Sequence, residues 1–255
     1  MIRGIYTAAA GMMANVIRQQ ATTNNLANIS TPGYKEDSPV AAAYPQMLIL
    51  GPNGLGPFPT ASSLSGIGDL GTGVMINGVE TNLAQGPLKQ TGNPLDFSLS
   101  GEAFFVVQSP GGDTYYTRNG AWAKDALGRL CTPDGYLVMG ESGPITVPEG
   151  GITVSEDGTI AAEGETIGRL RIATFPDGTV VEKVGSCLFA PAGGAQAIPA
   201  QDFAVHQGYL EASNVDEVRS MVEMISALRS YELQLRTISI ENQTLQLAVN
   251  ELGKV

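Results

Sequence analysis

The stretch SNVDEVRSMVEMISALRSYELQLRTISIENQTLQLAVNEL, residues 213–252, decides the fold at the C-terminal end of the chain. It contains neither glycine nor proline, the two residues that most disfavour a helix interior. Ser213 and Asn214 at its start are favourable N-cap residues, and Gly253 follows its end as a helix-terminating glycine. The sequence therefore predicts one long α-helix within residues 209–255.

Large side chains recur in this helix at alternating steps of three and four residues, which are the a and d positions of a seven-residue repeat. Such a seam is typical of coiled coils, and its one polar member, Asn242, has the character of an asparagine that fixes register. The alternative is an amphipathic helix packed on its own globular domain, but so long and narrow a seam favours a helical partner. The predicted assembly residues are Met221, Met224, Leu228, Tyr231, Leu235, Ile238, Asn242, Leu245, Val249 and Leu252.

The N-terminal segment shows the same spacing and would supply a helical partner, so we expect the two ends of the chain to lie side by side. Three asparagines, which hold a helix poorly, surround a leucine near the end of this segment. In a crowded bundle their amides could bridge neighbouring chains. Pro32 and Gly33 then end the helix. The predicted assembly residues here are Ile2, Ile5, Ala9, Met12, Val16, Asn24, Asn25, Leu26 and Asn28.

The middle of the chain has a different pattern. Residues 33–75 are rich in Gly and Pro and predict a linker after the N-terminal helix of residues 1–32. Residues 76–208 alternate apolar and polar positions between turns, and Pro-Asp-Gly occurs at 133–135 and 176–178, a strong hairpin signal. The predicted fold is therefore a mainly β central domain, antiparallel and rich in hairpins, flanked by terminal helices that form a coiled-coil-like helical domain.

Composition excludes several classes of protein function. The 255 residues carry a formal net charge of −11, which argues against binding to nucleic acid. No run approaches the ~20 apolar residues that cross a bilayer, so we expect no transmembrane segment. The N-terminus lacks an apolar core followed by a cleavage site, so we also expect no cleaved signal peptide.

Residues that carry chemistry are few. Cys131, Cys187 and the single His206 cannot supply the four ligands of a structural zinc site, and free thiols are favoured over a long-range disulfide. The match of GIGDLG, residues 66–71, to a dinucleotide motif has no strand and helix signals around it. The Asp-Gly pairs lack the ligand spacing of a calcium loop. We expect no catalytic residue, no cofactor site and no metal site.

Three separated blocks of the chain resemble the bacterial flagellar rod and hook proteins, in the order typical of that family. The first is NNLANISTPGYK, residues 24–35, and the second is QGPLKQTGNPLDFSLSGEAFFVVQSPGGDTYYTRNGAWAKDALGRLCTPDGYLV, residues 85–138. The third is QGYLEASNVDEVRSMVEMISALRSYELQLRTI, residues 207–238. Residues 36–75 lie outside the resemblance.

The resemblance implies a structural subunit of the flagellar basal-body rod, a hollow helical shaft that transmits torque across the cell envelope to the hook. The implied partners are further copies of the chain, other rod and hook axial proteins, and the flagellar type III export apparatus. The implied location is the basal body, reached without a cleaved signal peptide. The ending LAVNELGKV, residues 247–255, favours the proximal over the distal rod member.

A β-rich envelope or carbohydrate-binding module, oligomerised through its terminal helices, is the alternative from another class. Both hypotheses depend on apolar helix faces that a single chain leaves uncovered.

Overall fold

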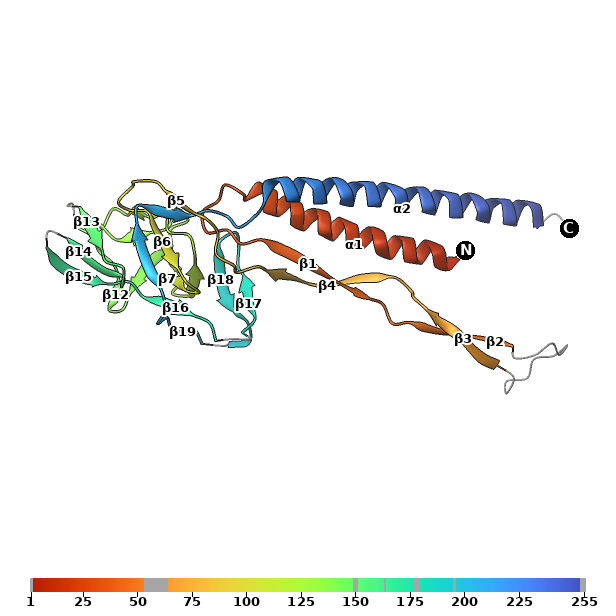
Figure 1. The fold of residues 1–255 in the computed structure, drawn as a ribbon, viewed down its shortest axis with the longest axis horizontal. Coiled ribbons are helices and arrows are strands. Elements are labelled where there is room, and N and C mark those ends of the chain that lie inside the picture. The colour runs from red at the N-terminus through yellow and green to blue at the C-terminus, as the bar shows by residue number, and fades with distance from the viewer. Residues whose placement is uncertain are drawn as a thin grey trace. The chain divides into compact units, whose positions relative to one another are not determined.

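The computed structural model describes residues 2–52, 64–148, 151–162, 164–176, 179–194 and 196–252. It has an N-terminal helix, a central antiparallel β region and a C-terminal helix, which confirms the predicted fold class (Figure 1). The chain forms two compact units, each built from separated segments. The first unit comprises Met1–Asn24, Asp37–Glu80 and Val218–Val255, and the second comprises Asn25–Glu36 and Thr81–Glu217.

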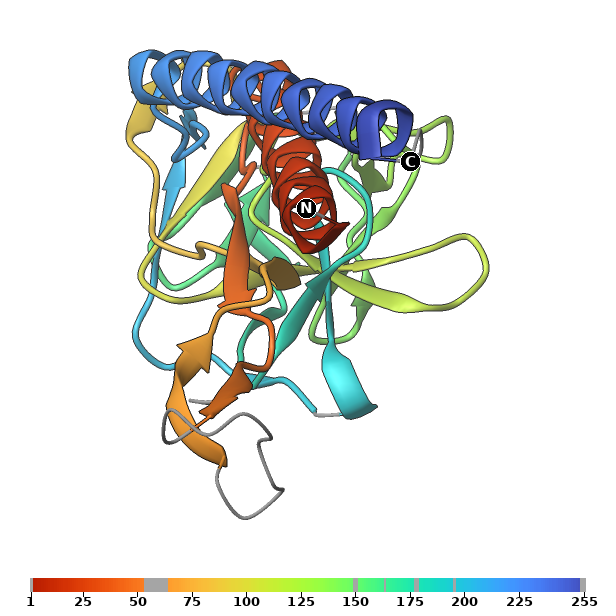
Figure 2. The ribbon, with the colours of Figure 1, turned by 90° about the vertical axis from the view of Figure 1, so that its right-hand side faces the viewer.

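The first unit contains nearly all of the two helices, α1 (Ile2–Ala27) and α2 (Glu217–Leu252); the end of α1 from Asn25 and the first residue of α2 belong to the second unit. Two strand pairs accompany them: β1 (Asp37–Ala43) with β4 (Val74–Thr81), and β2 (Met47–Pro52) with β3 (Leu64–Leu70). On one side α1 lies next to α2 (Figure 2). On another side Gly73, just before β4, packs against Thr7 and Ala10 of α1. Helix α1 is therefore covered from two directions.

The strands β1, β2 and β3 correct the prediction of a linker over residues 33–75. In β1 most side chains are exposed, because a two-stranded ribbon has no sheet neighbours to bury a face. The alternation of apolar and polar residues that announces a half-buried strand is therefore missing from the sequence. The ribbon is irregular as well, since the β2–β3 register shifts between Ile49 and Leu50.

The start of α2 also differs from the prediction, because the helix begins at Glu217 rather than directly after Ser213 and Asn214. The hydroxyl of Ser213 accepts a hydrogen bond from the amide of Val215 at 3.2 Å. The side chain of Asn214 accepts from the amide of Glu36 at 2.8 Å and donates to the carbonyl of Asn82 at 2.8 Å. Asn214 therefore connects separated segments of the second unit, and Ser213 holds a local turn before the helix.

The second unit is built on antiparallel strands. In its described part the largest sheet has the strand order β17-β18-β8-β7-β11-β10-β9, with β12 on β11, β16 on β7 and β19 on β16. A three-stranded sheet β13-β14-β15 and the pairs β20–β6 and β21–β5 complete it. The strands are β5 (Leu88–Gln90), β6 (Phe97–Ser100), β7 (Phe104–Gln108), β8 (Thr114–Thr117), β9 (Ala123–Lys124), β10 (Leu130–Cys131), β11 (Leu137–Gly140), β12 (Gly143–Pro144), β13 (Ile152–Val154), β14 (Thr159–Ala162), β15 (Glu165–Arg169), β16 (Ile172–Thr174), β17 (Val181–Lys183), β18 (Leu188–Pro191), β19 (Ile198–Pro199), β20 (Ala204–Gln207) and β21 (Tyr209–Glu211).

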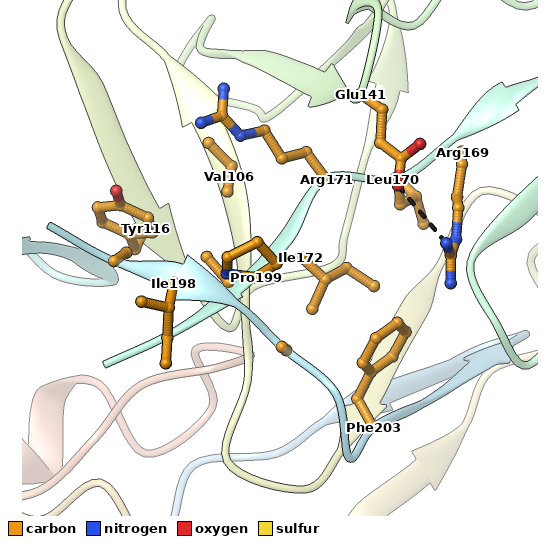
Figure 3. Close-up of a pocket in the computed structure, with 13 residues that line it drawn as sticks. Val106, Tyr116, Glu141, Arg169, Leu170, Arg171, Ile172, Ile198, Pro199 and Phe203 are labelled. Atoms are coloured by element: carbon orange, nitrogen blue, oxygen red, sulfur yellow. Dashed lines mark ion pairs between the residues drawn. The ribbon is translucent and has the colours of Figure 1, made fainter. Parts of the chain in front are cut away.

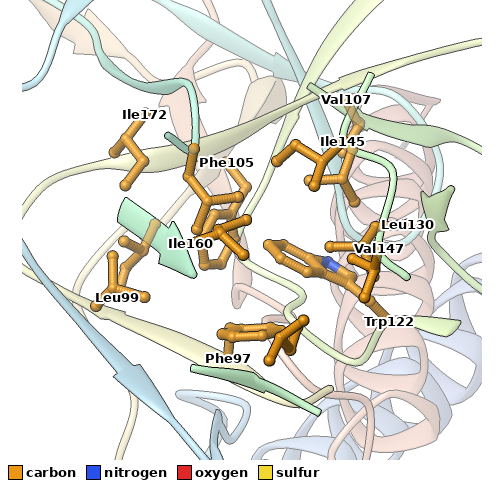
Figure 4. Close-up of a cluster of buried hydrophobic side chains, with 14 of the residues drawn as sticks. Phe97, Leu99, Phe105, Val107, Trp122, Leu130, Ile145, Val147, Ile160 and Ile172 are labelled. Carbon is orange, nitrogen blue, oxygen red and sulfur yellow. The ribbon is translucent and has the colours of Figure 1, made fainter. Parts of the chain in front are cut away.

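The core of this unit forms around β7, whose sequence FFVV is buried on both faces. Trp122 packs between Phe97 and Phe105, with ring centroids 4.7 Å from each (Figure 4). Leu99, on the strand next to this group, is also fully buried. Buried aromatic side chains of this size account for much of the stability of a β domain.

The last residues of α1, from Asn25, and the turn that follows them are an integral part of the second unit. Asn25 is buried, and its side-chain carbonyl accepts a hydrogen bond from the hydroxyl of Tyr34 at 3.0 Å. Thr31 donates to the side chain of Asn28 at 3.3 Å. Gly33 has φ +69°, and a Cβ placed there would collide with the backbone where residues 118 and 119 join. Two of the three asparagines thus hold a turn within their own chain.

A buried ionic cluster joins this turn to β21. The Glu211 carboxylate lies 2.6 Å from Lys35 Nζ and 3.3 Å from Arg118 Nη1, and all three side chains are at most 2% exposed. Glu211 also accepts a hydrogen bond from the amide of Gly86 at 2.8 Å. Its own backbone carbonyl accepts from the amide of Gly33. One carboxylate therefore connects residues from four separated segments of the chain.

We predict that Glu211→Ala destabilises the second unit by about 3–5 kcal/mol, because it leaves two buried cations without their shared counterion. Denaturant unfolding would measure this loss. Glu141→Ala is the control, since Glu141 forms an exposed ion pair with Arg169 at 3.5 Å and its loss should cost less than about 1 kcal/mol. Equal effects of the two substitutions would contradict the role given to Glu211.

We predict that the fold loses stability at alkaline pH because of Cys187. Both cysteines are free thiols, and burial raises the pKa of Cys187 to about 11 from a usual value of 9.0. Below pH 9 the thiol is protonated whether or not the chain is folded. Between pH 9 and 11 the unfolded chain loses this proton first, so the free energy of unfolding should fall by about 2–3 kcal/mol. Denaturant titrations at pH 8 and pH 11 would measure this decrease in the free energy of unfolding, and the Cys187→Ala variant should show a decrease that is smaller by this amount.

Candidate assembly surface

Helix α2 is covered along only one face. Along it, buried or half-buried side chains recur at steps of three and four residues, which places them in one narrow band. Two members of this band, Gln234 and Glu241, contact α1, so the band is the face that α1 covers as far as its own N-terminus reaches. Its members are Ser220, Met224, Ala227, Tyr231, Gln234, Ile238, Glu241, Leu245 and Ala248.

Small and polar residues lie at the closest approach of the two helices. A Cβ added at Gly4 would lie 2.8 Å from Glu241 Oε1, and one added at Gly11 would meet the amide of Gln234. Asn15 donates a hydrogen bond to Gln234 Oε1 at 3.0 Å. Because residues seven apart on α1 meet residues seven apart on α2 in reverse order, the helices run antiparallel with a matched repeat. The glycines let the long polar side chains of α2 lie across the backbone of α1.

This geometry divides the predicted seam of α2 into two rows. The d residues, Met224, Tyr231, Ile238 and Leu245, are half-buried in the covered band. The a residues are exposed, from 40% for Leu228 to 71% for Val249, with Met221, Leu235 and Asn242 exposed as well. The side chain of Leu252 lies outside the described residues.

Further apolar side chains lie outside the predicted seam. Leu233, Ile240 and Leu247 are each at least 61% exposed and are seven residues apart, so they form a second exposed row. Val222 and Ile225 are also more than half exposed. The sequence does carry this signal: apolar residues occur at f, b and e positions, where a two-helix coiled coil places polar ones. These positions lie outside a single a and d seam.

Helix α1 contributes less exposed apolar surface. Of its predicted residues, Val16 is 37% exposed, whereas Ile5, Ala9, Met12 and Leu26 are half-buried. The side chain of Ile2 lies outside the described residues. Asn24 is exposed, Asn25 is buried and Asn28 is half-buried. Two residues that were not predicted, Tyr6 and Met13, are about 70% exposed and seven residues apart.

The lengths of the helices explain part of this exposure. Helix α1 has 26 residues and α2 has 36, so α1 cannot follow α2 to its end. Exposed apolar residues in repeated rows differ from the scattered ones found on most surfaces and mark an interaction site. The rows on α2 are therefore the strongest candidate functional surface of the first unit.

A pocket of about 260 Å³ lies beside β16 and β19 in the second unit (Figure 3). Val106, Ile172 and Pro199 form apolar walls, while Arg169 and Glu141 pair across its edge at 3.5 Å. The ion pair is about half exposed, so water screens it strongly. A pocket of this size and composition suits a single side chain better than a substrate with its reacting groups.

Ser100 and His206 form a contact with the elements of a nucleophile–base pair. Ser100 Oγ lies 3.0 Å from His206 Nε2, on the paired strands β6 and β20. Within the described residues no carboxylate orients the other ring nitrogen, which a catalytic triad requires. The same residues contain no group of three His, Cys, Asp or Glu side chains that could hold a metal ion. A structural hydrogen bond accounts for this pair.

Neither of the helices in the described segments, α1 and α2, combines the length and the apolar character that a membrane-spanning helix needs.

Three family models match separate parts of the chain. Residues 5–35 match "Flagella basal body rod protein", residues 98–162 match "Flagellar hook protein FlgE/F/G D1 domain", and residues 206–251 match "Flagellar basal body rod FlgEFG protein C-terminal". The first match ends in the turn that holds Lys35, and the last contains Glu211 and nearly all of α2.

Curated relatives match the chain along almost its full length. The flagellar basal-body rod protein FlgG of Agrobacterium fabrum is 32% identical over 98% of this chain and 100% of the relative. The flagellar hook-basal body complex protein FlhO of Bacillus subtilis is 30% identical over 100% of both chains. The flagellar basal-body rod protein FlgF of Salmonella typhimurium is 33% identical over 94% of both chains. With identity at this level over the whole fold, the chain belongs to the flagellar basal-body rod protein family and is a structural subunit of the rod.

Proposed function

We propose that the exposed apolar rows of α2, with the smaller exposed surface of α1, are the contacts through which copies of this subunit assemble into a hollow helical shaft. The observation that carries this proposal is the exposure of both the a row and the Leu233–Ile240–Leu247 row while α1 already occupies the third face of α2. A helix that is apolar on several sides is stable in water only when further helices cover it. Additional copies of the chain would supply those helices.

The function implied by the family, transmission of torque along a shaft, agrees with such an assembly surface. Torque would pass between subunits through the many helix contacts, with no catalytic step. The neighbours would be copies of this chain and other rod and hook axial proteins within the basal body. The chain would reach the basal body through the type III export apparatus, without cleavage of a signal peptide. Among rod members we favour the proximal one, on the ending of residues 247–255. Family membership favours the rod subunit over the carbohydrate-binding alternative.

Leu228→Asp or Leu235→Asp should abolish rod assembly and swimming. Each substitution places a carboxylate in a contact that becomes apolar and dry on assembly, at a cost of at least about 3 kcal/mol for every subunit. Both residues are at least 40% exposed in the single chain, so the second unit should remain folded by near-ultraviolet circular dichroism.

Gln243→Asp is the matched control, because Gln243 is an exposed polar residue of the same helix. It should leave basal bodies and motility close to wild type. Normal swimming of the Leu228→Asp strain, or loss of assembly in the Gln243→Asp strain as well, would refute the assignment of the a row.

Deleting residues 2–24 should prevent both export and assembly while the second unit still folds. This deletion stops before Asn25, the first residue of the second unit, and so keeps the Asn25–Tyr34 hydrogen bond and the ionic cluster. Secretion assays of the culture medium would measure export. Wild-type secretion of the truncated chain would show that export information lies elsewhere.

A further inference from the structure

A second hollow in the second unit differs in chemistry from the pocket of Figure 3. It is a groove of about 630 Å³ between residues 83–85, the loop before β7 and the end of β16. Phe104 and Phe175 form its apolar walls, with ring centroids 5.3 Å apart. Glu102 and Thr174 lie at its edge, and Arg118 forms part of its base. The groove therefore combines aromatic walls with a buried cation.

The cation at the base is incompletely neutralised. Lys35 and Arg118 share the single carboxylate of Glu211, which leaves one excess positive charge in a nearly solvent-free cluster. Glu102 also acts on Arg118 through its charge, but it is exposed, so water screens this interaction, and among the described residues the two side chains make no ion pair. An excess charge in a region of low dielectric attracts an anion more strongly than a surface charge does.

The guanidinium of Arg118 also has unused hydrogen-bond capacity. Nη1 donates to Glu211 and Nη2 donates to the carbonyl of Gly101 at 2.6 Å. Nε has no hydrogen-bond partner within the described residues, although Arg118 is only 2% exposed. Buried donors are nearly always paired, and an orphan one at the base of a groove indicates an acceptor that belongs there.

The face of the guanidinium is occupied, because its central carbon lies 4.9 Å from the centroid of the Phe104 ring. Only the edges of the guanidinium, where its N–H bonds point, remain for a ligand. A cation in the groove would add to the excess charge, and an apolar group would leave the donors unpaired. A carboxylate would satisfy both the charge and the hydrogen bonds, because its two oxygens match the geometry of the guanidinium edge.

We propose that this groove binds a carboxylate, and that in the assembled rod the carboxylate is an Asp or Glu side chain of a second copy of this chain. The second part rests on the proposed function. Charge complementarity supports this occupant, since each copy carries 25 acidic against 14 basic residues and so presents carboxylates in excess.

The binding step can be tested on the unassembled full-length chain with benzoate as the probe and benzamide as a neutral control of the same shape. Benzoate should shift the ¹⁵N–¹H resonance of Arg118 Nε and the amide signals of Gly101 and Phe175, whereas benzamide should not. Equal shifts with both probes, or none with benzoate, would overturn the carboxylate site. This outcome is independent of whether the chain assembles.

Two substitutions make the test specific. Thr174→Glu places a carboxylate of the chain's own inside the groove and should weaken benzoate binding at least about tenfold, because it competes for the same donors. Thr174→Gln is the matched control, since it equally removes the hydrogen bond from Thr174 to the Glu102 carbonyl but adds no charge. Glu102→Gln removes a competing charge and should tighten benzoate binding about threefold. If both Thr174 variants behave alike, the groove is not a carboxylate site.

The source of the carboxylate is tested in cells. Thr174→Glu should reduce the yield of complete basal bodies, and Thr174→Gln should not. If Thr174→Glu blocks benzoate binding but assembles normally, a second copy does not supply the carboxylate and that part of the proposal is overturned. If Leu228→Asp assembles normally while the Thr174 variants behave as expected, the helix rows are not the assembly contact and the carboxylate site in the groove still stands.

Discussion

The carboxylate of Glu211 is the interaction on which the second unit depends. It is the shared counterion of Lys35 and Arg118, two cations that an apolar core could not hold alone, and it accepts a hydrogen bond from the amide of Gly86. The residues it joins come from the turn after α1, from the β region and from the segment before α2. The ends of the central region are therefore part of its core, and the unit cannot be complete without residues 25–36.

The helices differ from the second unit, because the single chain leaves much of their apolar surface exposed. Glycine, Asn15, Gln234 and Glu241 occupy the contact between α1 and α2, while leucine and isoleucine lie exposed on other faces of α2. A self-sufficient helical hairpin would have the reverse distribution. Folding within the chain thus half-buries one apolar row, the d residues, beside these polar and small residues, and leaves the other apolar rows of α2 to contacts with other molecules.

Much of this organisation could be predicted from the sequence. The long glycine-free stretch predicts α2, and the Asp-Gly turns predict an antiparallel β region, because both signals are local. The strands of residues 37–70 could not be predicted, since an isolated ribbon buries neither face and leaves no alternation of apolar residues. The a and d seam identifies apolar rows but not which of them α1 covers. That depends on Gly4 and Gly11, whose role appears only when Glu241 and Gln234 are placed across them.

Two of the three asparagines near the end of α1 have a role within their own chain. Their amides invite an explanation through neighbouring chains, yet Asn25 binds Tyr34 and Asn28 binds Thr31 in the same turn. Gly33, inside that turn, has a stricter consequence. Its left-handed backbone and the main chain pressed against it leave no room for even a methyl group, so the position tolerates no other amino acid. A substitution at Gly33 that abolishes motility therefore does so by disrupting the fold of the single subunit. Such a variant gives no information about the contacts between rod subunits.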